Sequence, residues 1–109
     1  METVIAYKLF RLRSDGSIGP LFINRRQRIP VGVWLEAEAH PTAGFAYRPG
    51  WHCTLLPIAP HLKTTLKSGE VRKWFKVEVQ GIETFQRPES QGGTWVLAKR
   101  LRVIEELKQ

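Results

Sequence analysis

The sequence predicts an α+β fold: one small, β-rich domain of mostly antiparallel strands with one or two short helices. The chain has 109 residues, which suits a single domain and is too short for two independent cores. Apolar and polar residues alternate with period two along several segments, and turn sequences separate these segments. Within the single domain 1–109 we expect an N-terminal hairpin and connection over residues 1–43 and a core over residues 44–109.

The N-terminal third is expected to form a β-hairpin. Residues 2–13 read as a strand, and the dipeptide Asp15-Gly16 is typical of a tight hairpin turn. The alternating positions of this strand form two faces: Ala6, Lys8, Phe10 and Leu12 against Tyr7, Leu9, Arg11 and Arg13. A second short strand follows over residues 21–24, so residues 7–24 are predicted to be the hairpin. Residues 33–39 (VWLEAEA) are compatible with a short helix or with another strand.

Three further strands are expected in the C-terminal part. Residues 51–58 (WHCTLLPI) predict a strand that Pro57 ends, and residues 71–79 (VRKWFKVEV) alternate most regularly of all. The segment 87–93 (RPESQGG) is rich in turn residues and predicts a loop. Residues 94–98 are expected to be a strand, and residues 101–107 a strand or a short helix.

Composition narrows the class of protein. Hydrophobic residues make up 42% and charged residues 25% of the chain, which is typical of a globular domain. No uncharged stretch approaches the roughly 20 apolar residues that a membrane helix needs, and the N-terminus lacks the pattern of a secretory signal. The single cysteine, Cys53, has no partner for an internal disulfide. We therefore expect a cytoplasmic protein without a membrane partner, and the sequence leaves its oligomeric state open.

The chain is strongly basic, with a formal net charge of +7 and a pI of about 10.1. Such an excess favours polyanionic partners, including nucleic acid and phosphate-bearing ligands. One hypothesis is therefore a non-enzymatic, basic accessory protein of the phage or mobile-element type that binds nucleic acid or a host protein. The basic run at residues 25–28 supplies its candidate phosphate contacts, Arg25, Arg26 and Arg28.

The segment 44–54 (GFAYRPGWHCT) contains the most informative side chain, His52, at a strand start behind a Pro-Gly turn. An imidazole there either has a structural role, packed in the protein or capping the strand, or it binds a ligand. Metal binding is not expected, because His52 and Cys53 are neighbours on a strand and point to opposite faces. The Gly-rich phosphate-loop patterns are absent from the sequence.

Residues 50–54 (GWHCT) resemble the aromatic-His-Gly-Thr motif on the first core strand of ADP-ribosyltransferase-like domains, with Cys53 in place of the glycine. Residues 71–90 and 92–107 resemble the C-terminal half of the small rifamycin-modifying ADP-ribosyltransferases. Residues 60–63 (PHLK) stand where RNA 2′-phosphotransferases, of the same class, have a His-Leu-Ser-like segment. The resemblance covers residues 44–107.

This resemblance implies a protein that binds NAD or a related ADP-ribose or phosphate-bearing ligand, with transfer of ADP-ribose as the activity that the resemblance suggests. It implies catalytic roles for His52 and Glu89, with the carboxylate polarising a hydroxyl and stabilising an oxocarbenium-like charge. The ligand-binding residues would be His52, Thr54, Arg48, Tyr47 and His61, with Arg48 pairing with the pyrophosphate. NAD is the expected cofactor, and no metal is expected.

Overall fold

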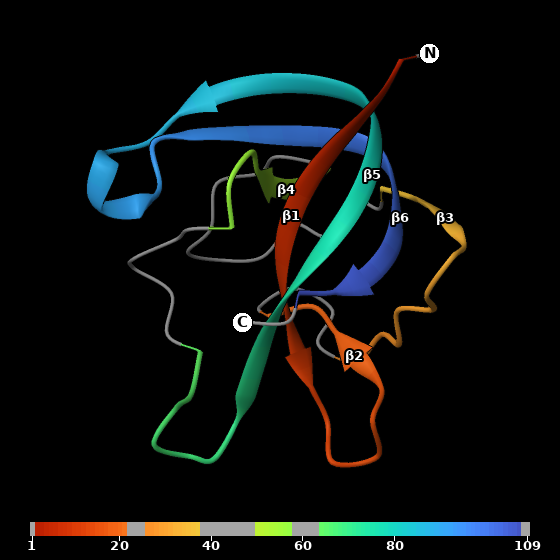
Figure 1. Ribbon diagram of the computed structural model, residues 1–109, viewed down its shortest axis with the longest axis vertical. Coiled ribbons are helices and arrows are strands. Elements are labelled where there is room, and N and C mark those ends of the chain that lie inside the picture. Colours follow the sequence, from red (N-terminus) through yellow and green to blue (C-terminus); the bar gives the residue numbers. More distant parts are fainter. Residues whose placement is uncertain (1, 22–25, 38–49, 58–63, 108–109) are drawn as a thin grey trace.

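Antiparallel strands make up most of the computed structural model, which describes residues 2–21, 26–37, 50–57 and 64–107 (Figure 1). In chain order the elements are β1 (Thr3–Leu12), β2 (Ile18–Gly19), β3 (Trp34–Glu36), β4 (Trp51–Thr54), β5 (Val71–Gln86), the 3-10 helix η1 (Glu89–Gln91) and β6 (Thr94–Glu106). Every pairing between these six strands is antiparallel. The predictions of strands at residues 2–13, 71–79 and 94–98 are confirmed.

The expected α+β class with one or two short helices is wrong. Within the described residues, the only helix is the three-residue η1, so the fold is an all-β antiparallel sheet. Both segments for which a helix remained an alternative are strands. Residues 34–36 form β3 and pair with Arg102 to Arg100, and the C-terminal segment continues β6 as far as Glu106. This pairing satisfies the backbone groups of both segments, which local propensity alone does not specify.

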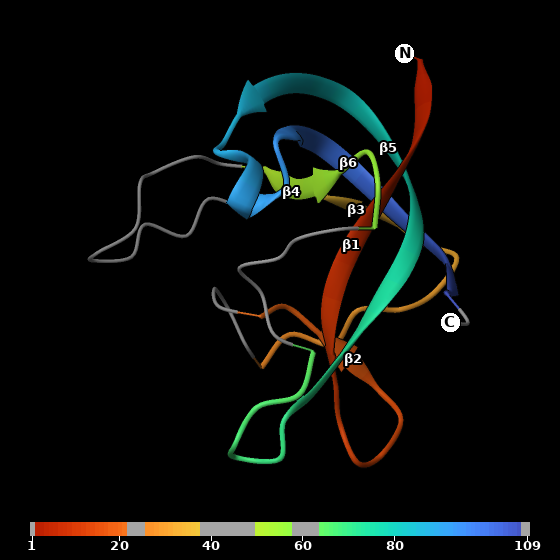
Figure 2. The same ribbon diagram turned by 60° about the vertical axis from the view of Figure 1, so that its left-hand side comes forward.

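Four of the strands close into a ring. β5 has β1 along one edge and β6 along the other, and β4 lies between β6 and β1. The contact that completes the ring is short, because β1 and β4 pair only at Tyr7 and Thr54. β2 extends the sheet beside β1, and β3 extends it beside β6. Figures 1 and 2 show how strongly β5 and β6 bend to make this closure possible.

The predicted hairpin is present but short. Asp15-Gly16 lies in the turn after β1, and Gly16 has a positive φ of 89°. Only Ile18 and Gly19 of the returning segment pair with β1. Most of the predicted second strand, at residues 22–24, lies outside the described residues.

β5 passes through a glycine with a left-handed backbone conformation. Gly81 has a φ of 66°, a left-handed conformation that other residues adopt only with strain. A side chain at this position would also approach Lys99 of β6, whose Cβ lies 3.0 Å from the place of an added Cβ. The first half of β5 therefore packs between β1 and β6, while its second half turns away with β6 alone.

The hydrophobic core fills the inside of the ring. Its fully buried side chains come from all four ring strands, and the core includes Ala6, Phe10, Cys53, Val77, Val79, Val96, Leu101 and Val103. Phe10 and Phe75 meet edge to face at the centre, with ring centroids 5.7 Å apart. A second cluster, on the opposite side of β1, contains Leu9, Leu21, Trp74 and Trp95. Both faces of β1 are therefore apolar in part: one face contributes to the core and the other to the second cluster, and neither is fully exposed to solvent.

Gly50 fixes the way the chain enters β4, and it yields a first prediction. Its φ is 144°, and an added Cβ would lie 2.7 Å from Cγ of Leu97. We expect Gly50→Ala to lower the free energy of unfolding by roughly 1–3 kcal/mol, because it adds a clash to backbone strain. The measurement is urea unfolding. Gly69→Ala is the control, since Gly69 also has a positive φ but an added Cβ would meet open space. If both variants lose the same free energy of unfolding, the clash with Leu97 has no effect.

Candidate functional site

His52 lies on β4 opposite Leu97 of β6, with its side chain half-buried. Its ring packs edge to face against Phe85 of β5, with centroids 5.7 Å apart and planes at 84°. The backbone oxygen of His52 accepts a hydrogen bond of 2.8 Å from Nζ of Lys8. The imidazole therefore belongs to an aromatic surface patch, while its backbone contacts a cation from β1.

Arg87, the residue that follows β5, adds a cation to this aromatic patch. The guanidinium of Arg87 stacks over the ring of Phe85 at 5.5 Å and over the ring of Trp95 at 4.9 Å. Phe85 and Arg87 could not be identified from the sequence, because the position of Phe85 beside His52, and of Arg87 over Phe85, depends on the pairing of β5, β6 and β4. The patch combines π faces with a delocalised cation, an arrangement that suits planar or anionic groups.

Thr54 and Glu89 occupy different surroundings from those the resemblance implies. Thr54 is only 2% exposed, and its hydroxyl donates to the backbone oxygen of Leu56 and lies 3.4 Å from that of Tyr7. Glu89 is exposed in η1, where its backbone oxygen accepts a hydrogen bond from the amide of Gly92. No contact between His52 and Glu89 is found among the described residues. The hydroxyl of Thr54 thus serves the end of β4 in this structure.

Tyr47, Arg48, His61 and Arg25 lie outside the described residues. Their assigned roles in ligand or nucleic-acid binding stay predictions.

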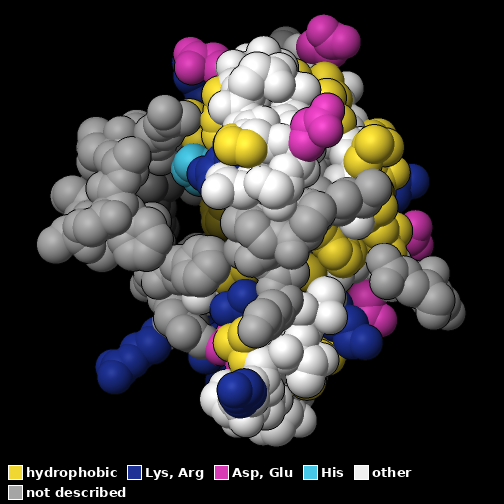
Figure 3. Space-filling view, turned by 90° about the vertical axis from the view of Figure 1, so that its left-hand side faces the viewer, with side chains coloured by type: hydrophobic (Ala, Val, Ile, Leu, Met, Phe, Trp, Pro, Cys, Tyr) yellow, Lys and Arg dark blue, Asp and Glu magenta, His cyan; other side chains and the backbone are white. Residues whose placement is uncertain are grey.

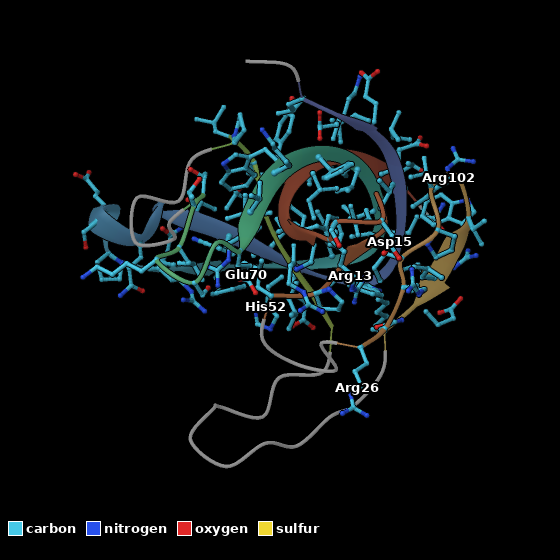
Figure 4. The ribbon with its side chains drawn as sticks, turned by 90° about the horizontal axis from the view of Figure 1, so that it is seen from below. Arg13, Asp15, Arg26, His52, Glu70 and Arg102 are labelled. Atoms are coloured by element: carbon cyan, nitrogen blue, oxygen red, sulfur yellow. The ribbon has the colours of Figure 1, made fainter. Side chains whose placement is uncertain are left out.

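Arg26 and Arg28 are exposed beside the β1–β2 turn. Arg28 pairs with Asp15 at 2.9 Å. Hydrogen bonds from Ser17, and after them the contact with Arg28, hold the pKa of Asp15 well below its usual range. Seen from below in Figure 4, Arg26 extends away from the body of the protein, so its guanidinium is presented to solvent.

These two arginines belong to a larger basic surface, which we call the basic end. It surrounds the β1–β2 turn and the turn that precedes β5. Among the described residues it contains six cationic side chains and two carboxylates: Arg11, Arg13, Arg26, Arg28, Lys67 and Arg72, with Asp15 and Glu70. In Figure 3, basic side chains likewise gather mainly over the lower half of the molecule.

The inner part of the basic end is rigidly held. Arg13 donates to the backbone oxygen of Gln27 at 3.0 Å and to the hydroxyl of Ser17 at 3.3 Å. Arg72 is 7% exposed and pairs with Glu70 at 3.0 Å. Between the two turns lies an open groove of about 440 Å³, lined by Arg11, Leu12, Arg13, Ser14, Ser68, Gly69 and Glu70. Hydrogen bonds and an ion pair therefore hold Arg13 and Arg72 in place at the basic end, while Arg26 and Arg28 are exposed.

Within the described part of the chain, no three His, Cys, Asp or Glu side chains are grouped so that they could hold a metal ion. The described part likewise includes no helix of the length and apolar character that crossing a membrane requires. Comparisons with protein-family models, with curated proteins and with solved structures give no significant match.

Proposed function

We propose that this protein binds nucleic acid through its basic end. The observation that carries the proposal is the local excess of cations at the basic end, six against two carboxylates, where Arg11 and Arg13 line an open groove. A phosphate backbone is the polyanion that such a surface attracts, because neutralising it releases condensed counterions. Serine hydroxyls and guanidinium groups line the groove, and both groups donate hydrogen bonds to phosphate oxygens.

The proposal concerns contact with the phosphate backbone rather than recognition of a base sequence. Arg11, Arg13 and Arg72 are partly or fully buried, so the more exposed Arg26, Arg28 and Lys67 would make the outer phosphate contacts. Arg28 exchanges its contact with Asp15 for a phosphate at small cost, because an exposed ion pair contributes little stability. Affinity for a duplex should consequently depend weakly on sequence and steeply on salt.

NAD binding and ADP-ribose transfer stay a prediction with less support. The hydroxyl of Thr54 faces the backbone, and Glu89 lies in exposed η1 without contact to His52. The aromatic patch around His52 is compatible with a nucleotide, but it does not by itself favour NAD over other planar anions. An NAD titration monitored by the melting temperature tests this prediction directly.

The salt dependence of binding tests the proposed function. We expect the double variant Arg26→Gln/Arg28→Gln to bind a dye-labelled DNA duplex about tenfold more weakly than the wild type near 100 mM NaCl. We also expect the slope of log affinity against log salt to fall by roughly two, one for each lost phosphate contact. Fluorescence anisotropy at several NaCl concentrations measures both quantities.

The matched control removes the same charge elsewhere. Arg100 and Arg102 lie on β6, where they flank the ring of Trp34 and pair with Glu36 and Glu78. Arg100→Gln/Arg102→Gln should therefore leave affinity and slope nearly unchanged. If this control loses as much affinity as the first double variant, binding follows net charge and the basic end is not the interface. If the wild type fails to bind the duplex at low salt, the proposed function is wrong.

A further inference from the structure

Lys8 is a cation in an apolar setting. Its side chain belongs to the face of β1 that points into the ring, between Ala6 and Phe10, which are both fully buried. Its register partner on β5 is Phe75, and the inward neighbour Val77 is fully buried too. A lysine at such a position is uncommon, because removing an ammonium from water is unfavourable unless another charge compensates for it.

Lys8 lies where the ring is weakest. β1 and β4 pair at Tyr7 and Thr54, and they separate immediately beyond that point. Next to this single backbone pair, a side chain links the two strands: Nζ of Lys8 donates a hydrogen bond of 2.8 Å to the backbone oxygen of His52. The same Nζ lies 5.7 Å from the centre of the Phe10 ring. The side chain is only partly buried, so solvent reaches this position.

The groups around Lys8 do not neutralise its charge. The titratable group that faces it from β4 is the thiol of Cys53, whose pKa burial raises to about 11, so this thiol is uncharged at neutral pH. From β5 it meets the apolar Phe75 and Val77, and within the described residues no carboxylate pairs with it. Burial accordingly lowers the pKa of Lys8. Among the described residues, the partners of the ammonium are therefore one carbonyl, of His52, and one aromatic ring, of Phe10.

We propose that Lys8 binds a small oxyanion of the phosphate class at the point where β1 and β4 separate. An ammonium has three N–H donors, and the carbonyl of His52 occupies one, so two remain for the oxygens of an anion. A compact, tetrahedral oxyanion matches the point charge of a lysine. The site is distinct from the basic end, and the inference does not depend on the proposed function.

The test observes Lys8 itself in the wild-type protein. Sulfate serves as the probe, because it mimics phosphate but keeps its charge over the pH range in which lysine titrates. We expect millimolar sulfate, at constant ionic strength, to shift the Nζ-adjacent ¹³Cε NMR signal of Lys8 and to raise its pKa by roughly one, equivalent to tenfold tighter binding to the ammonium than to the amine. If the signal and the pKa of Lys8 do not respond to sulfate, the proposal is wrong, even if sulfate binds elsewhere.

A pair of variants separates this site from the basic end. Sulfate should bind at least tenfold more weakly to Lys8→Met than to Lys73→Met, since Lys73 is exposed on β5. Arg26→Gln/Arg28→Gln should leave the response of Lys8 intact. Equal responses to inorganic phosphate and to AMP would identify a phosphate-group site, and a stronger response to AMP would identify a nucleotide site that includes the neighbouring His52 patch. Loss of the response in the Arg26/Arg28 variant would instead assign the anion to the basic end and overturn the proposal.

Discussion

Phe10→Ala should lower the free energy of unfolding by about 3–5 kcal/mol. Phe10 is fully buried, and its ring meets that of Phe75 at the centre of the core. The truncation removes buried apolar surface and leaves a cavity that the surrounding strands cannot fill, because they are locked into a closed ring by pairing on both edges.

The effect is measured by urea unfolding, with Leu56→Ala as the control. Leu56 is 65% exposed, so its truncation should change stability by less than about 0.5 kcal/mol. A similar loss in both variants, or a loss below about 1 kcal/mol for Phe10→Ala, would show that the centre of the ring is not packed as described.

The strands with regular alternation could be predicted from sequence. Residues 71–79 alternate cleanly, and three residues of one face, Phe75, Val77 and Val79, lie in the core, while Trp74 of the other face is buried in the second cluster. On β1 the predicted face that contains Ala6 and Phe10 is likewise the inward one. A local pattern of period two is enough here, because it records which side of the strand meets the core.

The helices were predicted wrongly because the deciding information is not local. Residues 33–39 have helix-compatible composition, yet Trp34 to Glu36 pair with a part of β6 more than 60 residues away. The predicted strand over residues 71–79 was too short, because a glycine such as Gly81 can either end a strand or lie within it, and here β5 continues through Gly81 as one strand of 16 residues. Glycine permits either outcome, and only the partner strand selects between them.

The same limit applies to the candidate sites. His52 could be found from its turn and its neighbours, but its contacts with Lys8 and Phe85 join segments 44 and 33 residues apart in sequence. The basic end also assembles distant segments, since Arg72 lies directly opposite Arg11. The run at residues 25–28 was a visible signal for part of this surface. The contribution of β1 and β5 appears only once the register of these strands is known.

Alkaline pH should destabilise the protein through Cys53. Burial raises the pKa of this thiol from 9.0 to about 11, while the positive charge of Lys8 opposes the shift. In the unfolded chain the thiol loses its proton above about pH 9, whereas in the folded chain it keeps the proton. The unfolded state therefore binds fewer protons between pH 9 and 11, and the free energy of unfolding falls through this window.

The thiol alone is expected to lower the free energy of unfolding by about 2–3 kcal/mol by pH 11, because each tenfold change in proton concentration between the two pKa values contributes roughly 1.4 kcal/mol. Lys8 acts in the opposite direction. Between its lowered pKa in the folded chain and 10.5, the unfolded chain holds the ammonium proton that the folded chain has lost, so the contribution of Lys8 to stability rises with pH up to about 10.5. The difference between wild type and Cys53→Ala cancels the titrating groups that do not interact with Cys53, and it reports the thiol together with its electrostatic interaction with Lys8. Urea unfolding of both proteins at pH 8, 9, 10 and 11 measures this difference. The free energy of unfolding of the wild type should fall relative to that of Cys53→Ala as pH rises. If the difference between the two free energies stays constant, the thiol is exposed to water rather than buried inside the ring.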